Sequence, residues 1–377
     1  MHILYIGQFI GFAGGIERYA YQTAQALREA GFEVDYAGDE PSRDEALFRS
    51  GFSRVLSREE LTQPDAPQYD LVVLQKLCSL ELLKRLRWQY GERLVFVAHD
   101  HDLYCMRHHY YTPFGRRNCN LSCGLLRCAL CSRISHPRNW HRSPLESWRL
   151  LRELRNHRAI VLSKYMRNNL VLNGFKENLV HLVHPFVTPI AQIGERPFMP
   201  EGKLRILFLG QLIRGKGCDL LLQALAQLQV PYVATIAGDG EDRPMLEVMA
   251  RELNISANVK FLGWVTEPVR LFDDCDVLAF PSRWQEPFGL GGLEAHAHGI
   301  PAVGFDVGGV GEWLGDGITG LLVPPGDFAS FAIGLKCIAQ HAQLSGFMGR
   351  NAVALVRKQF SQVRFVSAIT KMIGDWR

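Results

Sequence analysis

The sequence contains no long hydrophobic run. No uninterrupted apolar stretch reaches the ~18 residues that a membrane-spanning helix needs, and the mean hydropathy of the chain is close to zero. Residues 1–7 also lack the basic start and the small-residue cleavage site of a secretory signal, and they lead directly into a strand-like run. These absences argue against a polytopic membrane protein. We expect a cytoplasmic protein, either free or at the inner face of the membrane.

A strong excess of one charge is missing as well. The 377 residues carry 42 Lys and Arg against 38 Asp and Glu, and a net charge of +4 is too small to indicate nucleic acid as a partner. The charge is uneven, because residues 101–160 hold eleven Arg against Asp102, Glu146 and Glu153. This Arg-rich segment is either a solvated helix face or a contact with an anionic acceptor or a membrane surface.

Short β-branched runs alternate with longer helical patterns along the whole chain. This alternation is typical of parallel sheets covered by helices on both faces. The opening run 3–7 is repeated at 204–210, each time as a strand that ends in Gly before a loop and a helix. Together with a length of about two and a half typical domains, the repeat predicts two doubly wound, Rossmann-like α/β domains that face each other across a cleft. Strands are expected near 2–7, 33–37, 70–75, 93–98, 159–162, 179–183, 204–210, 232–237, 258–262, 276–280, 301–305 and 320–323.

Domain boundaries follow from composition. The stretch from Pro185 to Lys203 holds four Pro and two Gly without periodicity, which is typical of a linker. The final helix could pack back on the amino-terminal domain or stay on the carboxy-terminal one, and the sequence does not choose. The expected parts are an amino-terminal domain at 1–185 with a Cys- and Arg-rich insertion at about 101–158, a linker at 186–203, a carboxy-terminal domain at 204–360 and a helix at 361–377.

Two loops that follow strands carry chemistry, because ligands of doubly wound sheets bind at the carboxyl ends of the strands. The first contains Gly14 and Gly15 ahead of a helix, so that the backbone can approach an anion at the helix start. The second carries Arg214 and Lys216, two cations that could balance a diphosphate. Each has a simpler interpretation, which is a tight turn for the glycines and solvated side chains for the cations.

The segment 280–301 is the most specific part of the sequence. A strand ends near Pro281, Glu286 lies in the following loop, and small residues from Gly289 open a helix whose amides can bind phosphate oxygens. Glu294 falls about one turn into that helix, within reach of a ribose beside it. Two carboxylates separated in this way suit a nucleotide sugar, with one binding sugar hydroxyls and the other ribose hydroxyls.

These residues resemble the retaining glycosyltransferases of GT-B fold, the family also called glycosyl transferases group 1. Glu286 and Glu294 match the paired glutamates of that family, and Lys216 matches its Lys-Gly pair. The amino-terminal half adds Gly15, from the family's glycine pair, and His99, which matches the His beside the reacting sugar. The resemblance covers nearly the whole chain and implies that residues 204–360 bind a nucleotide sugar.

The resemblance implies a retaining, hexosyltransferase-type enzyme. The donor would be a nucleotide-diphosphate sugar of UDP or GDP type, and the acceptor a hydroxyl of a glycan, lipid-linked or cell-envelope molecule in polysaccharide or lipopolysaccharide biosynthesis. The implied catalytic residues are His99, Lys216 and Glu286, and the implied donor-binding residues are Gly15, Gln211, Arg214, Phe288, Gly289, Leu290 and Glu294. The departing diphosphate would be stabilised by the cations and the helix start, so no cofactor is required for catalysis.

Gln211 departs from the family pattern, which usually has Arg at this place. A neutral amide cannot balance a leaving diphosphate, so Arg214 on the same loop, or Arg283, would have to supply the charge. The departure keeps a catalytically silent glycosyltransferase-like partner as an alternative. A UDP-sugar epimerase of the same fold is a second alternative.

Nine Cys in a cytosolic chain of this length do not predict a disulfide framework. Cys128 and Cys131 have the two-residue spacing of zinc ligands, and with Cys105 and Cys119 they resemble a spacing seen in a subset of these glycosyltransferases. One interpretation is a structural zinc, and the other is a loop of reduced thiols. The ligand set stays open because other candidate ligands lie nearby, namely Cys123, His108, His109 and His136.

A second metal interpretation concerns the tetrad from His99 to Asp102. Two His and two Asp at alternate positions could bind a cation, but alternation along an extended segment sends the two pairs to opposite sides. We therefore do not expect a metal at this tetrad.

Overall fold

The computed structural model consists of two compact units. The first contains residues 1–185 together with 362–377, and the second contains residues 186–361. The structure describes residues 1–62, 67–76, 80–106, 110, 112, 118–135, 144–188, 198–199 and 201–375. Most of the predicted linker and parts of the predicted insertion, including His108, His109 and His136, lie outside the described residues.

The first unit is built on a parallel sheet of seven strands in the order β5-β3-β1-β6-β7-β8-β9. All residues of β6 and β7 are buried, as expected for central strands covered by helices on both faces. The strands are β1 (His2–Ile6), β3 (Glu33–Ala37), β5 (Val55–Leu56), β6 (Leu71–Leu74), β7 (Leu94–Ala98), β8 (Arg158–Val161) and β9 (Val180–Leu182), and a separate short pair is formed by β2 (Phe9–Ile10) and β4 (Glu40–Pro41).

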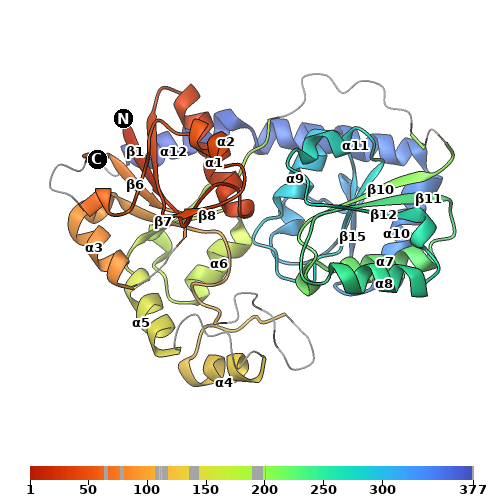
Figure 1. The fold of residues 1–377 in the computed structure, drawn as a ribbon, viewed down its shortest axis with the longest axis horizontal. Coiled ribbons are helices and arrows are strands. Elements are labelled where there is room, and N and C mark those ends of the chain that lie inside the picture. The colour runs from red at the N-terminus through yellow and green to blue at the C-terminus, as the bar shows by residue number, and fades with distance from the viewer. Residues whose placement is uncertain are drawn as a thin grey trace. The chain divides into compact units, whose positions relative to one another are not determined.

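Helices from both ends of the chain cover this sheet. The final helix α12 packs beside α1, and Figure 1 shows it in blue next to the red first strand. The ring of Phe365 in α12 lies edge-on to the ring of Tyr19 in α1, with centroids 6.5 Å apart. The helices of this unit are α1 (Gly15–Glu29), α2 (Glu45–Ser50), α3 (Leu80–Tyr90), α4 (Leu125–Ser135), α5 (Pro144–Leu154), α6 (Lys164–Leu172) and α12 (Gln362–Gly374).

The second unit is built on a parallel sheet of six strands in the order β12-β11-β10-β13-β14-β15. Figure 1 shows α7 and α8 on one face of this sheet and α9 and α11 on the other. The strands are β10 (Leu204–Leu209), β11 (Tyr232–Ala237), β12 (Val259–Gly263), β13 (Val277–Phe280), β14 (Ala302–Phe305) and β15 (Gly320–Val323). The helices are α7 (Cys218–Gln227), α8 (Arg243–Glu252), α9 (Leu290–Ala297), α10 (Phe328–Gln340) and α11 (Ala342–Gln359).

Both sheets are doubly wound, which confirms the predicted fold class. In each sheet the chain first moves outward on one side of the first strand and then returns to continue on the other side. The strand order therefore reverses between β1 and β6 in the first unit and between β10 and β13 in the second. Ligands of such sheets bind outside the carboxyl ends of the strands at this switch point, so the loops after these four strands are the first places to look for a site.

The described residues contain no helix that is both long and apolar enough to span a lipid bilayer.

Candidate functional site

Two loops meet at the switch point of the second sheet, one after β10 and one after β13. The backbone N–H of Arg283 donates to the carbonyl of Gly215 over 2.8 Å, and the Ser282 Oγ lies 3.3 Å from the same oxygen. Gly217 has a φ of +71°, and a Cβ there would lie 1.9 Å from the carbonyl oxygen of Pro281. Only glycine permits this approach, so the glycine of the Lys-Gly pair serves to bring the two loops together.

Lys216 and Glu286 form an ion pair at this junction. The Lys216 Nζ lies 2.7 Å from Glu286 Oε1, and the Ser282 hydroxyl donates to the same carboxylate oxygen over 2.5 Å. Glu286 is 5% exposed, whereas 27% of the Lys216 side chain is exposed. The two predicted catalytic residues of this unit are therefore in direct contact, and Ser282 is a third member that the sequence did not single out.

The loop after β14 holds the backbone of Glu286. The N–H of Gly309 donates to the Glu286 carbonyl over 2.7 Å. Gly308 has a φ of +58°, and a Cβ there would lie 2.2 Å from the same carbonyl oxygen. Three strand ends therefore fix the position of this buried carboxylate.

Helix α9 begins directly beside the ion pair. Gly289 precedes it with a φ of +100°, a conformation that favours glycine. Gly292 packs flat against Trp313, where a Cβ would lie 2.1 Å from the ring, and the Trp313 Nε1–H donates to the Phe288 carbonyl over 2.7 Å. Glu294 lies about one turn into the helix and is half-buried. The helix start thus presents backbone amides and one carboxylate.

The predicted donor-binding residues around α9 are not equivalent. Phe288 is 1% exposed, and its ring packs against Phe360 with centroids 5.5 Å apart. A ligand at the helix start would therefore meet the backbone of Phe288, whereas Leu290 is the first residue of α9 and half-buried.

The arginines of the loops after β10 and β13 differ in the partners that they contact. Arg283 forms a two-pronged ion pair with Asp219, one arm of which is 2.6 Å long, and it also donates to the carbonyl of Arg214 over 3.0 Å. Arg283 is therefore held by the protein itself. Arg214 and Gln211 are both exposed, and the role of Arg214 as the substitute for the family's usual arginine stays a prediction.

His99 directly follows β7 in the first unit. Its Nε2 lies 2.6 Å from Oε1 of Gln75, and its ring meets the ring of Tyr19 edge-on with centroids 5.0 Å apart. Burial lowers the pKa of His99 to about 3; the nearby Asp100 charge opposes this fall, and the Lys76 charge adds to it. The imidazole is therefore neutral at physiological pH.

The tetrad from His99 to Asp102 bends in a turn and is not extended, contrary to our expectation. The turn brings Asp100 and Asp102 to the same cation, since the Lys76 Nζ lies 2.8 Å from an oxygen of each. Burial raises the pKa of Asp102, and the neighbouring Asp100 charge adds to the rise. His101 is buried elsewhere, 2.6 Å from the Tyr104 hydroxyl, so the four side chains do not converge on one point.

The start of α1 contains a carboxylate of its own. Glu17 is 7% exposed and accepts hydrogen bonds from the backbone N–H groups of Glu17 itself and Gly14. A glutamate three residues after the capping position commonly reaches back in this way. An anion that binds at Gly14 and the exposed Gly15 would therefore meet a helix start that Glu17 already caps. The three-residue spacing between Gly14 and Glu17 was the feature of the sequence that could have predicted this cap.

The described cysteines of the insertion are not gathered into a group of metal ligands. In the part of the chain that the structure describes, no three His, Cys, Asp or Glu side chains could hold a metal ion together. Cys128 is hydrogen-bonded to Cys123, and this bond is the largest reason why the pKa of Cys128 falls to about 6. The described arrangement thus pairs Cys128 with Cys123, whereas the spacing had pointed to Cys131, and the zinc site stays a prediction without geometric support.

Most arginines in the described part of the insertion either donate hydrogen bonds to backbone carbonyls or are exposed to solvent. Arg155 donates to the Asn173 carbonyl over 2.6 Å, and Arg158 donates to the Glu92 carbonyl over 2.8 Å. On α5, exposed arginines lie opposite the buried Leu150, Leu151 and Leu154. Helix α5 therefore has the solvated face that was one of the two interpretations.

Helix α4 has a different surface. Leu126 and Leu130 are 85% and 60% exposed, Leu121 just before the helix is 54% exposed, and Arg127 is exposed between them. Three large apolar side chains and a cation are therefore exposed within residues 121–130.

Two family comparisons match the two halves of the chain. Residues 13–189 match the family described as Glycosyltransferase Family 4, and residues 191–352 match the family described as Glycosyl transferases group 1. Together these matches cover most of the chain.

Curated relatives match over part of their length. The chain is 33% identical over 160 residues to the uncharacterized glycosyltransferase MJ1607 of Methanocaldococcus jannaschii, covering 41% of each chain. It is 29% identical over 170 residues to the lipopolysaccharide core biosynthesis glycosyltransferase LpsE of Rhizobium meliloti, covering 45% of this chain and 49% of that protein. The matches therefore span less than half of the length of these two relatives.

Solved structures match over the whole chain. The Anabaena protein Alr3699/HepE, in complex with UDP and glucose, has a TM-score of 0.75 at 20% identity, with 100% of both chains covered. The lipopolysaccharide outer core galactosyltransferase WaaB has a TM-score of 0.69 at 16% identity, with 100% of this chain and 99% of that chain covered. At these identities the likeness shows the fold, which is the two-domain fold expected from the sequence.

Proposed function

Because the chain belongs to the glycosyl transferases group 1 family, we propose that it transfers a sugar from a nucleotide-diphosphate donor to a hydroxyl acceptor with retention of the anomeric configuration. The observation that carries the proposal is the ion pair of Lys216 and Glu286 beside the start of α9 at the switch point of the second sheet. A cation and helix amides in one place suit the diphosphate of a nucleotide sugar, and the buried carboxylate beside them suits its sugar hydroxyls.

Each group has a proposed role in the transfer. Lys216, Arg214 and the amides at the start of α9 stabilise the departing diphosphate, which develops charge as the sugar–phosphate bond breaks. Glu286 binds hydroxyls of the donor sugar, and Glu294 binds the ribose. His99 contacts the sugar near the reacting centre, and we expect the reaction to need no metal because protein groups supply the positive charge.

The donor is proposed to be a UDP-sugar, with a GDP-sugar as the second choice. Support comes from the solved structures of similar fold, of which Alr3699/HepE is described in complex with UDP-glucose. Relatives whose names refer to lipopolysaccharide core biosynthesis and D-rhamnosyl transfer support a glycan or lipid-linked acceptor of the cell envelope.

We further propose that α4 contacts the membrane surface from which a lipid-linked acceptor is presented. Leu126 and Leu130 would insert at the interface while Arg127 meets anionic headgroups. Co-sedimentation with vesicles tests this: binding should require phosphatidylglycerol and should fall in the double variant Leu126→Ser, Leu130→Ser. The matched control is Val363→Ser on α12, which removes an equally exposed apolar side chain, 78% exposed, from another surface.

Nucleotide release from a panel of UDP- and GDP-sugars tests the transferase function itself. A transferase releases the nucleoside diphosphate in the presence of an acceptor, and slowly by hydrolysis in its absence. A UDP-sugar epimerase would interconvert sugars without net nucleotide release in turnover. The neutral Gln211 is the reason for the alternative of a catalytically silent partner, which would release no nucleotide. Thermal-shift measurements with the same panel of sugars would show whether such a protein still binds a donor.

A further inference from the structure

A buried glutamine in the first unit makes a short contact with His99. Gln75 follows β6 at the switch point of the sheet and is 2% exposed. Its backbone N–H donates to the Ile6 carbonyl over 2.8 Å, which ties it to β1, and its Oε1 lies 2.6 Å from the His99 Nε2. Neither the motif pattern nor the family resemblance had singled out this residue.

We propose that Gln75 is a positioning residue that holds His99 in the tautomer with its proton on Nε2, so that Nδ1 presents a lone pair to a hydroxyl of the substrate. The part of this proposal that concerns the substrate rests on the proposed function. The part that concerns the tautomer rests only on contacts within the first unit.

The direction of the hydrogen bond follows from the chemistry of the two groups. An amide oxygen only accepts hydrogen bonds, so the His99 Nε2 must donate to the Gln75 Oε1. A neutral imidazole carries a single ring proton, and Nδ1 is then an acceptor. Because burial keeps the ring neutral, this assignment holds across the physiological pH range.

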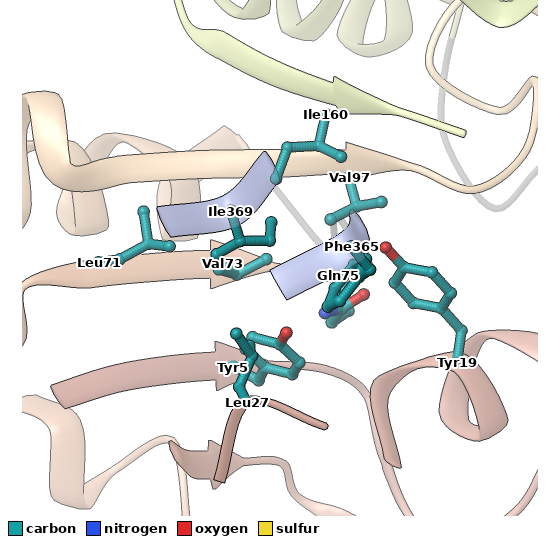
Figure 2. Close-up of a pocket in the computed structure, with 10 residues that line it drawn as sticks. All are labelled: Tyr5, Tyr19, Leu27, Leu71, Val73, Gln75, Val97, Ile160, Phe365 and Ile369. Atoms are coloured by element: carbon teal, nitrogen blue, oxygen red, sulfur yellow. The ribbon is translucent and has the colours of Figure 1, made fainter. Parts of the chain in front are cut away.

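The opposite end of the Gln75 amide explains why its oxygen faces the histidine. The Nε2 of Gln75 is buried without a hydrogen-bond partner among the described residues. It lies at a cavity of about 10 Å³, which Figure 2 shows between the strands and the side chains of Phe365 and Ile369 from α12. That volume is roughly what one water molecule needs, so an N–H group that requires an acceptor faces a space that can supply one.

Tyr5 lines the same cavity and can complete this arrangement. Burial raises the pKa of Tyr5, and the nearby Thr23 hydroxyl opposes that rise. A phenolic hydroxyl can both donate and accept hydrogen bonds, so the Tyr5 oxygen can accept one from a water in the cavity. A water in the cavity would accept from Gln75 and donate to Tyr5, and a reversed amide would place its oxygen against the cavity and two donors against His99.

The ring of His99 is held on its other side as well. Tyr19 meets it edge-on at 5.0 Å, and Phe365 of α12 meets Tyr19 edge-on at 6.5 Å. The charged groups near the ring are Asp100 on its own loop and Lys76 on the loop after β6, and their effects on its pKa oppose each other. Gln75 is therefore the neighbour that decides which ring nitrogen carries the proton.

Long-range ¹H–¹⁵N correlation spectra of ¹⁵N-histidine-labelled full-length protein test the tautomer without substrate. The signals of His99 are identified by their loss in His99→Gln. We expect the Nε2–H pattern between pH 5.5 and 8, and loss of a single fixed tautomer in Gln75→Leu. An Nδ1–H pattern in the wild type, or an unchanged pattern in Gln75→Leu, would overturn the proposal.

Gln75→Glu is the isosteric variant that keeps the test informative if leucine destabilises the fold. A carboxylate at this position should raise the pKa of His99, so that the ring titrates within the range studied. The matched control is Gln89→Leu, which removes a partly buried glutamine elsewhere in the first unit, whose Nε2 donates to the Leu61 carbonyl. This variant should leave the His99 signals unchanged. A His99 ring that stays neutral in Gln75→Glu would count against direct contact.

Turnover supplies the second readout. In an active preparation, Gln75→Leu should lower kcat roughly 10- to 100-fold, the usual effect of losing a group that orients a site residue, with a smaller change in donor KM. Unchanged kcat beside an altered tautomer would overturn the positioning role. If the wild type releases no nucleotide from any donor, the proposed function fails, while the spectra still decide the tautomer.

Discussion

The ammonium of Lys216 and the carboxylate of Glu286 lie 2.7 Å apart, although seventy positions separate them in the chain. The two residues were predicted to act on different parts of the donor, one on the diphosphate and the other on the sugar. Their contact means that the cation already has a partner before a ligand binds, and that the nearly buried carboxylate depends on it. A substitution of either residue should therefore affect both the binding of the diphosphate and the binding of the donor sugar.

Replacing Lys216 should affect rate and stability together. In Lys216→Ala we expect a loss of about 100-fold in kcat, because a charge that meets the developing anion is removed. Leaving Glu286 with Ser282 alone should also lower the free energy of unfolding by about 1–3 kcal/mol. Steady-state kinetics and urea denaturation measure the two effects. Lys336→Ala is the control, since the ammonium of that lysine donates to an exposed side chain, the Gln229 Oε1 3.1 Å away. Near-normal turnover of Lys216→Ala would remove Lys216 from the mechanism.

The two glutamates should give different kinetic signatures. Glu286→Ala should mainly lower kcat, because this carboxylate is proposed to act near the reacting carbon. Glu294→Ala should mainly raise the donor KM, because contacts to the ribose are made throughout the reaction. The measurement is kcat and KM for the donor in both variants at saturating acceptor. Small and equal effects would contradict the assignment of the pair.

Arg214 should carry the charge that Gln211 lacks. Arg283 is engaged with Asp219, so Arg214→Ala should be as damaging as Lys216→Ala. Introducing Gln211→Arg in the Arg214→Ala background should recover part of the rate by placing a cation at the family's usual position. Donor turnover of the single and double variants decides the matter, and wild-type activity in Arg214→Ala would refute the compensation.

His296 should make stability depend on pH. Burial lowers its pKa to about 3 in the folded protein, whereas an unfolded histidine binds a proton below about pH 6.5. Between these two pKa values the unfolded state binds a proton at His296 and the folded state does not. The free energy of unfolding should therefore fall as the pH drops from 7 towards 3. Between pH 7 and pH 5 the contribution of one such histidine is about 2 kcal/mol.

Urea denaturation at the two pH values measures this effect. The pH-dependent loss should be smaller by about that amount in His296→Leu. It should be unchanged in His341→Gln, which alters an exposed histidine. Equal pH dependence in His296→Leu and the wild type would show that the buried ring does not control the transition.

Cys128 should be the most reactive thiol of the insertion. Its pKa of about 6, set mainly by the hydrogen bond from Cys123, makes it a thiolate at pH 7, whereas burial raises the pKa of Cys218. Iodoacetamide labelling followed by peptide mapping should modify Cys128 first, more slowly in Cys123→Ala, and leave Cys218 intact. The predicted zinc site would instead be supported if elemental analysis found about one zinc per chain and the thiols were protected from labelling. Both the zinc and this protection should then be lost in the double variant Cys128→Ser, Cys131→Ser.

The sequence by itself determined the parallel α/β architecture. All twelve strands expected from β-branched runs are present to within one or two residues, from β1 (His2–Ile6) to β15 (Gly320–Val323). Strands of this kind are buried on both faces, and their apolar runs are long enough to be recognised locally. The short strands β2, β4 and β5 were not predicted, because two residues carry no periodicity. Positions after the strands, such as Lys216 and Glu286, could be singled out for the same local reason.

Only the tertiary structure decided which side chains meet. The final helix joins the first unit, where Phe365 closes the cavity beside Gln75, although its amphipathic pattern would have suited either domain. The contacts of Gln75 with His99, of Cys123 with Cys128 and of Arg283 with Asp219 depend on strand order, on the course of a turn and on loop packing. Periodicity reports which face of an element is buried, but it contains no information about the partner on that face. Those partners follow from the packing of strands and loops that are distant in the chain.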